Sequence, residues 1–464
     1  MEDCMEAKLA WENYDDAKME EVFALSERYK KFISDCKTER ECVRETARIA
    51  REAGYRDLNE VIEAGETLKS GDKVYAINME KNIVLFCIGK QPIEKGMNIL
   101  GAHIDSPRID LKQNPLYEDS SLALLDTHYY GGIKKYQWVS QPLAIHGVVA
   151  KKDGSVVEIV IGEKEDDPVI GISDLLIHLA QDQLQKTGAK VVEGEDLNVL
   201  VGSIPLKAED EKERTVKANI LRLLKELYDI EEEDFLSAEL EVVPAGKARD
   251  YGFDRSMIMG YGHDDRVCAY TSLEAMLQVE HPERTSVCIL VDKEEIGSVG
   301  ATGMCSRFFE NTVAEVMECA GEYSELKLRR ALTNSKMLSS DVSAAFDPNY
   351  PGVFEKKNTA FFGRGFVFNK YTGARGKSSS NDANAEYMAE IRAIMEKDGV
   401  CFQTAELGKV DQGGGGTIAY IMANYNMQVI DAGIAVQNMH APWEVVSKAD
   451  VYEAMVGYRA FLKA

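Results

Sequence analysis

The chain has little positive charge, no long apolar run and no regular arrangement of cysteines. Its 464 residues include 54 Lys and Arg against 78 Asp and Glu, which gives a formal charge of -24 at pH 7. So large an excess of acidic residues argues against a surface for nucleic acid or anionic lipid. No apolar stretch approaches the ~18 residues that a membrane helix needs. We therefore expect neither a nucleic-acid partner nor membrane insertion.

The nine cysteines are scattered, and no two of them form a C-x-x-C pair. An odd number without regular spacing disfavours a disulfide framework and also a zinc site built from thiolates. The N-terminus, Met-Glu-Asp-Cys-Met-Glu, is acidic and lacks the apolar segment behind a basic flank that marks a signal peptide. These features favour a protein of the reducing cytoplasm.

The pattern of apolar residues divides the chain into two kinds of segment. Toward both ends strands alternate with helices, which is typical of α/β layers. Between about Arg108 and Val243 short alternating runs, Leu143–Ala150 and Val156–Ile161, indicate antiparallel strands. We predict one domain from residues 1–107 and 250–464 and an inserted domain over 108–249. The alternative is a single domain with a long excursion, since no Pro/Gly-rich linker marks the boundaries.

Several elements are predicted from periodicity and turn residues. Lys73–Asn78 and Ile83–Ile88 are predicted to form a hairpin. An acidic segment from Ala208 to Glu239 has a helical rhythm. Further predicted helices span 267–279, 303–319, 384–397 and 448–462, and further strands span 286–291, 365–368 and 427–433.

A pair of glutamates stands where one buried strand ends. The apolar run Val287–Val291 is followed by Glu294, Glu295 and a glycine-rich stretch. Side chains alternate faces along a strand, so the two carboxylates can serve one site only if the strand has ended and the backbone turns. The following glycines permit such a turn. The alternative is a solvated loop tip.

Other polar groups also follow apolar runs. Because ligands bind at the carboxyl ends of strands in α/β sheets, such groups can converge there. Imidazoles and carboxylates without thiolates suit zinc, manganese or cobalt in a hydrolytic site. Two metals need a bridging carboxylate, further ligands and one carboxylate left to take a proton. That scheme is filled by His103, Asp264, Glu295, Asp341 and His440, with Glu294 as the base.

Each of these residues also has a simpler interpretation. A histidine at a strand end is commonly structural, and Asp264-Asp265 before a helical run could serve as a helix cap. The joint occurrence of the clusters, each after an apolar run, favours the metal site.

The motifs around these residues resemble those of the M18 aminopeptidases, the aspartyl aminopeptidase family of the MH clan. They are Gly-Ala-His103-Ile-Asp105-Ser-Pro, His-Asp264-Asp-Arg, Asp-Lys-Glu294-Glu295-Ile-Gly-Ser, Ser-Ser-Asp341-Val-Ser and Met-His440. The likeness runs from the strand before His103 to the helix after His440. It implies a three-layer, mixed-sheet α/β catalytic domain of the di-zinc exopeptidase type, with an inserted, mainly-β dimerisation domain.

The resemblance also implies roles for single residues. Asp264 would bridge two zinc ions, with manganese or cobalt as alternatives, and Glu294 would be the general base. Asp105 would hold the ring of His103, as metal-binding histidines usually require. His178, in Gly171–Leu179, matches a histidine that reaches a neighbouring subunit's site in the family; the alternative is a histidine buried in the dimer interface. His103, Glu295, Asp341 and His440 would complete the two coordination shells.

The implied activity is removal of the N-terminal residue of peptides, with Asp or Glu as the candidate preference. The implied assembly is a homo-oligomer in which dimers form a tetrahedral dodecamer. Two alternatives are a metal-dependent acyl-amino-acid hydrolase or carboxypeptidase on the same fold, and a catalytically silent scaffold. The scaffold is disfavoured because no ligand and no base is lost.

Two segments depart from the family pattern. His263 stands where an apolar residue commonly precedes the bridging aspartate. The segment Asn369–Ser378 does not closely match the region by which eukaryotic aspartyl members read an acidic side chain. It is basic, through Lys370, Arg375 and Lys377, which would suit an acidic substrate residue; the alternative is a flexible surface loop. The run Gly413–Gly416 lacks the Lys-Ser/Thr ending of a phosphate-binding loop.

Overall fold

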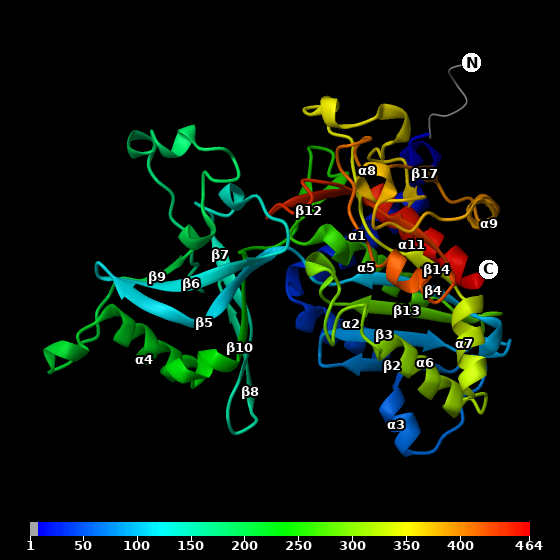
Figure 1. The fold of residues 1–464 in the computed structure, drawn as a ribbon, viewed down its shortest axis with the longest axis horizontal. Coiled ribbons are helices and arrows are strands. Elements are labelled where there is room, and N and C mark those ends of the chain that lie inside the picture. Colours follow the sequence, from blue (N-terminus) through cyan, green and yellow to red (C-terminus); the bar gives the residue numbers. More distant parts are fainter. Residues whose placement is uncertain (1–7) are drawn as a thin grey trace. The chain divides into compact units, whose positions relative to one another are not determined.

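The computed structural model describes residues 8–464, which form two compact units (Figure 1). The first unit contains the chain up to Asp105, Ala248–Met439 and Glu444–Ala464. The second contains Ser106–Lys247 and the short segment His440–Trp443. Within residues 8–464, none of the helices combines the length and the hydropathy that a membrane-spanning segment requires.

The first unit is built on a nine-stranded mixed sheet with the order β1-β2-β3-β13-β4-β14-β18-β16-β17. Its centre, β13-β4-β14-β18, is parallel, and β3 and β16 pair antiparallel on either side of this centre. Every residue of β3, β4 and β13 is buried, which explains their continuous apolar sequences. The strands are β1 (Arg56–Asp57), β2 (Lys73–Asn78), β3 (Asn82–Cys87), β4 (Met97–His103), β13 (Thr285–Val291), β14 (Lys336–Ser339), β16 (Phe366–Asn369), β17 (Phe402–Thr404) and β18 (Gln428–Gly433).

Helices form a separate hydrophobic core on each face of this sheet. The arrangement confirms the predicted three-layer α/β fold. One face carries α1 (Asp16–Asp35), α2 (Glu39–Glu52), α5 (His263–Leu277), α9 (Ala385–Lys397) and α11 (Lys448–Lys463). The other carries α3 (Leu58–Glu63), α6 (Phe308–Cys319), α7 (Glu325–Asn334) and α10 (Ala419–Ala423).

A smaller, five-stranded sheet completes the first unit, in the order β11-β12-β20-β19-β15. Its strands β12 and β20 pair antiparallel, and β12 ends shortly before α5 begins. The strands are β11 (Arg249–Tyr251), β12 (Met257–Gly260), β15 (Ser343–Ala344), β19 (Ala435–Gln437) and β20 (Glu444–Ser447).

Most predicted elements of the first unit are present, and the hairpin of β2 and β3 is confirmed. The helix predicted over 303–319 was wrong at its start, because α6 begins only at Phe308. Residues 303–306 instead fold back on the preceding loop. A Cβ atom at Gly303 would lie 2.1 Å from the carbonyl oxygen of Ser298, so this glycine is required by the close approach of two loop segments.

The second unit is a six-stranded antiparallel sheet with the order β8-β7-β10-β5-β6-β9. Helix α4 (Val216–Tyr228) packs against β5, β6 and β9. The acidic segment predicted to be helical from Ala208 to Glu239 is α-helical only within α4, and short 3-10 turns flank it. The strands are β5 (Arg108–Asp119), β6 (Leu122–Tyr130), β7 (Leu143–Ala150), β8 (Val156–Ile161), β9 (Val199–Gly202) and β10 (Ala238–Pro244).

Candidate metal centre

Polar side chains lie at one edge of the large sheet, where the three neighbouring parallel strands β13, β4 and β14 end. His103 is the last residue of β4 and pairs with Val291, the last residue of β13. The two glutamates therefore follow three and four residues after Val291, the partner of His103 on the next strand. On the other side of β4, Asp341 follows β14, and the Ser340 N–H donates to the Gly101 carbonyl at 2.6 Å. The convergence predicted from the sequence thus follows from strand order and register.

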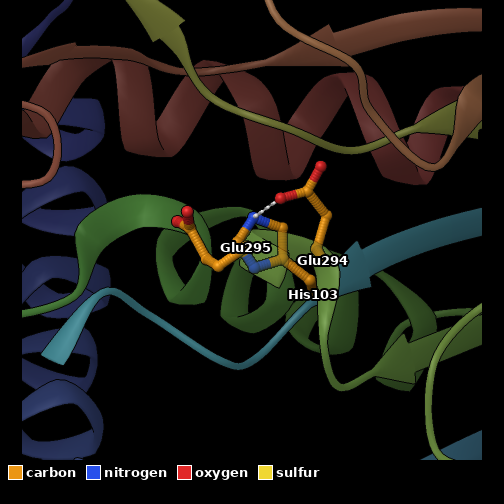
Figure 2. Close-up of side chains that lie close together, drawn as sticks. All are labelled: His103, Glu294 and Glu295. Atoms are coloured by element: carbon orange, nitrogen blue, oxygen red, sulfur yellow. Dashed lines mark ion pairs between the residues drawn. The ribbon is translucent and has the colours of Figure 1, made fainter. Parts of the chain in front are cut away.

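The buried His103 ring contacts carboxylates through both of its nitrogens. Its Nδ1 lies 2.9 Å from the backbone oxygen of Asp105 and 3.3 Å from that residue's Oδ1. Its Nε2 lies 3.2 Å from Asp264 Oδ1 and 3.8 Å from Glu294 Oε2 (Figure 2). With Nδ1 directed at Asp105, Nε2 is the ring nitrogen that faces Asp264 and Glu294, and it is the one that would bind a metal ion.

The two glutamates lie on a 3-10 turn, Glu294–Ile296, between Lys293 and Gly297, which both have positive φ angles. The Asp105 carboxylate accepts one N–H on each oxygen, from Glu294 and from Glu295, both at 3.1 Å. In Figure 2 the two carboxylates extend in different directions, and that of Glu294 reaches His103. The Glu294 side chain is only 14% exposed, so the solvated loop tip is not what the structure shows.

The pair Asp264 and Asp265 occupies a distorted start of α5. Both residues have non-helical dihedral angles, and the peptide bond between them is cis. The Asp264 N–H donates to Glu444 Oε2 at 3.0 Å, and Asp265 Oδ2 accepts the backbone N–H of His103 at 3.3 Å. The residue before the helix is Gly262, which has no side chain to cap it, and both aspartates make contacts outside the helix.

These side chains form a crowded, largely buried set of carboxylates around one imidazole. The ligand atoms of His103, Glu294 and Glu295 lie within 4.8 Å of one another, as do those of His103, Asp265 and Asp341. Burial raises the pKa of the Asp265 carboxyl well above its usual value, with His103 opposing and Asp264 adding to the shift. Burial and the Asp265 charge likewise raise the pKa of Asp341.

The same crowding acts on the imidazole. Burial lowers the pKa of His103, yet the Asp105 and Asp264 carboxylates outweigh it and hold that pKa well above the usual value. Like charges gathered out of water are stabilised by a cation among them. The donor set of imidazole nitrogen and carboxylate oxygen therefore fits a bound zinc ion.

Two predicted residues belong to the second unit. His440 lies in the His440–Trp443 segment, and its Nδ1 is 2.9 Å from the Gly132 carbonyl oxygen of the same unit. His178 lies in a short 3-10 turn, Ile177–Leu179, and is exposed. Their proposed roles stay predictions.

Sequence reasoning missed two of the contacts at the centre. The Asp265 carboxylate was not expected to hold the His103 backbone, although its place beside Asp264 was a signal. Glu444, which accepts the Asp264 N–H, lies in none of the motifs.

The sequence over residues 32–462 matches the family described as aminopeptidase I zinc metalloprotease (M18). The chain belongs to the M18 family. A relative from Clostridium acetobutylicum, named Probable M18 family aminopeptidase 1, is 66% identical over 457 residues, covering 98% of each chain.

Solved structures agree with this assignment. The M18 aminopeptidase of Thermotoga maritima shares 46% identity, covers 99% of both chains and superposes with a TM-score of 0.94. The mApe1 dodecamer of S. cerevisiae shares the fold at 21% identity, with a TM-score of 0.76 over 96% of this chain and 97% of that one. This M18 protein is therefore a metallopeptidase of the aminopeptidase type, and the fit of its donor set to zinc agrees with the family description.

Proposed function

We propose that this M18 peptidase removes N-terminal residues from peptides with two divalent cations, zinc first and manganese or cobalt as alternatives. Asp264 would be shared by the two cations, and His103, Glu295, Asp341 and His440 would be the other residues that hold them. The observation that carries the proposal is the approach of His103 Nε2 to Asp264 Oδ1, 3.2 Å, where three parallel strands end. A purely structural histidine requires one or two hydrogen-bond partners, whereas His103 lies near the carboxylates of Asp105, Asp264 and Glu294.

The residues divide the chemical work among them. Bound cations supply a Lewis acid and lower the pKa of a water molecule. Glu294 accepts the proton of the attacking water at its carboxylate and passes it to the leaving amine. Asp105 fixes the Glu294–Glu295 turn through both backbone N–H groups and orients the His103 ring. His178 of a neighbouring copy stabilises the reacting carbonyl oxygen.

Blocked and unblocked peptides separate the proposed activity from its alternatives. We expect cleavage of peptides with a free α-amine, no cleavage of their N-acetylated forms, loss of activity with a chelator and recovery with zinc. Cleavage of N-acetylated amino acids, or release of C-terminal residues, would instead indicate an acyl-amino-acid hydrolase or a carboxypeptidase. A zinc-loaded protein that turns over none of these substrates would support the scaffold.

We further propose a preference for acidic N-terminal residues. A pocket of about 180 Å³ lies between residues 371–377 and 406–413, and Arg375, Lys377 and Lys409 are among the residues that line it. Lys370, which is not among them, and Lys377 both pair with Asp382. Lys409 donates to the Gly352 carbonyl, whereas no described residue forms an ion pair with Arg375, which lies in the short element α8 (Ala374–Lys377). We therefore assign the substrate carboxylate to Arg375.

Arg375→Ala is expected to raise KM by about 10- to 150-fold for substrates that begin with Asp or Glu, because one charged hydrogen bond is worth roughly 1.5–3 kcal/mol. Substrates that begin with Leu or Ala should be unaffected. Lys370→Ala is the matched control and should change neither KM. An equal change for acidic and neutral substrates would contradict the specificity role of Arg375.

The second unit offers a surface for assembly. Large apolar side chains around His178 are more than half exposed, which is unusual for a surface that stays in water. We propose that this segment contacts another copy, and that dimers assemble into a tetrahedral dodecamer. The mApe1 structure of S. cerevisiae, which has the same fold, is a dodecamer. The exposed side chains are Leu175, Leu176, Ile177, Leu179 and Leu184.

A further inference from the structure

A histidine that the family pattern does not predict lies directly before the proposed bridging residue Asp264. The His263 ring is completely buried, and its Nδ1 lies 2.6 Å from the hydroxyl of Tyr29, a buried residue of α1. The two ring centroids are 5.6 Å apart. Both residues are 0% exposed and 234 positions apart in the sequence, so this contact joins the N-terminal helix to the metal centre.

The contact lies out of reach of solvent, because both side chains are completely buried. A hydrogen bond between two buried side chains is directional and cannot be replaced by water without opening the core.

Segment 263–265 is held from three sides. The His263 ring contacts α1 through Tyr29, the Asp264 N–H contacts β20 through Glu444, and the Asp265 carboxylate contacts the end of β4. Asp264 and Asp265 lack helical dihedral angles, so the regular hydrogen bonds of α5 do not fix their positions. A Cβ atom at Gly260 would lie 3.5 Å from His263 Nε2, so β12 bounds the ring on a further side.

We propose that Tyr29 and His263 form a positioning pair that sets the place of the Asp264 carboxylate at the cation centre. The inference rests on the proposed function, in which Asp264 is a cation ligand. Of the three anchors, the Tyr29 hydroxyl is the one that can be removed without touching a residue at the centre. The pair acts through the backbone of Asp264 and does not contact the reacting atoms.

Tyr29→Phe removes only the hydroxyl and tests the proposal directly. We expect zinc affinity, measured by competition with a chromogenic chelator, to fall about tenfold, the lower end of the effect of outer contacts on metal sites. Tyr55→Phe is the matched control. Tyr55 is also buried, and its hydroxyl donates to the Met276 carbonyl at the far end of the same helix, at 3.2 Å. The control should lose comparable thermal stability and keep its zinc affinity.

A double variant separates positioning from mere stability. Tyr29→Phe with His263→Leu removes both polar partners, so the melting temperature should recover toward that of the native protein. Zinc affinity should stay weak if the hydrogen bond sets Asp264. Recovery of both quantities, native affinity in Tyr29→Phe, or an equal loss of affinity in Tyr55→Phe would each overturn the positioning role. Failure of the native protein to bind zinc would refute the proposed function instead.

Discussion

Glu294→Gln is expected to lower kcat by a factor of about 10²–10⁴, the usual contribution of a general base, while the bound cations stay in place. The amide has the shape of the carboxylate but cannot accept a proton from water. Glu294 is held for this task by the N–H group that it donates to Asp105, and its carboxylate lies 3.8 Å from His103 Nε2. Steady-state kinetics together with metal analysis measure both quantities.

The neighbouring residue provides the contrast. Glu295→Gln is expected to lose zinc, and to lose activity as a consequence, because Glu295 is proposed to be a ligand. Of these two adjacent residues, replacement of Glu294 would remove turnover alone, and replacement of Glu295 would remove zinc as well. Full zinc content with near-native turnover in Glu294→Gln would refute the assignment of the base, as would loss of zinc from that variant.

Asp105→Asn is expected to weaken zinc binding by about 10–100-fold and to reduce turnover, as replacements of outer partners of metal ligands do. Both oxygens of the carboxylate accept a backbone N–H, those of Glu294 and Glu295. An amide offers one oxygen and places its NH₂ group against the other N–H. The turn that carries both glutamates must therefore shift, and the His103 ring loses part of its support at Nδ1.

A carboxylate with similar hydrogen bonds but no place in the centre is the control. Asp254 accepts the Ser256 N–H at 3.1 Å and the Ser256 hydroxyl at 2.9 Å. Asp254→Asn should leave zinc affinity and kcat unchanged. Zinc affinity is measured by chelator competition and kcat by steady-state kinetics on both variants. Equal zinc affinity in Asp105→Asn and in the native enzyme would show that Asp105 does not position the centre.

The sequence predicted the α/β fold and the convergence of polar groups for a local physical reason. A strand buried on both faces must be apolar throughout, so β4 and β13 could be recognised from single runs of residues. Polar residues directly after such runs must lie at the sheet edge. His103, Glu294, Glu295 and Asp341 are candidate site residues on this basis.

The start of α6 and the contacts around the centre could not be read in the same way. The sequence allowed a helix from Gly303, but the approach of Ser298 places that glycine in a folded loop. The sequence likewise predicts the Asp105 carboxylate only as a partner of His103. In the structure it also accepts the N–H groups of both glutamates, which lie 189 and 190 positions away in the chain.

What the sequence determined by itself was the fold class, the edge at which the polar groups gather and the family. What only the tertiary structure decided was which groups hold the ligands in place, as with Tyr29 beside His263 and Glu444 beside Asp264. The reason is that burial and periodicity act over a few neighbouring residues and leave a local pattern. A hydrogen bond between residues far apart in the chain leaves none, because its partners are brought together only by packing.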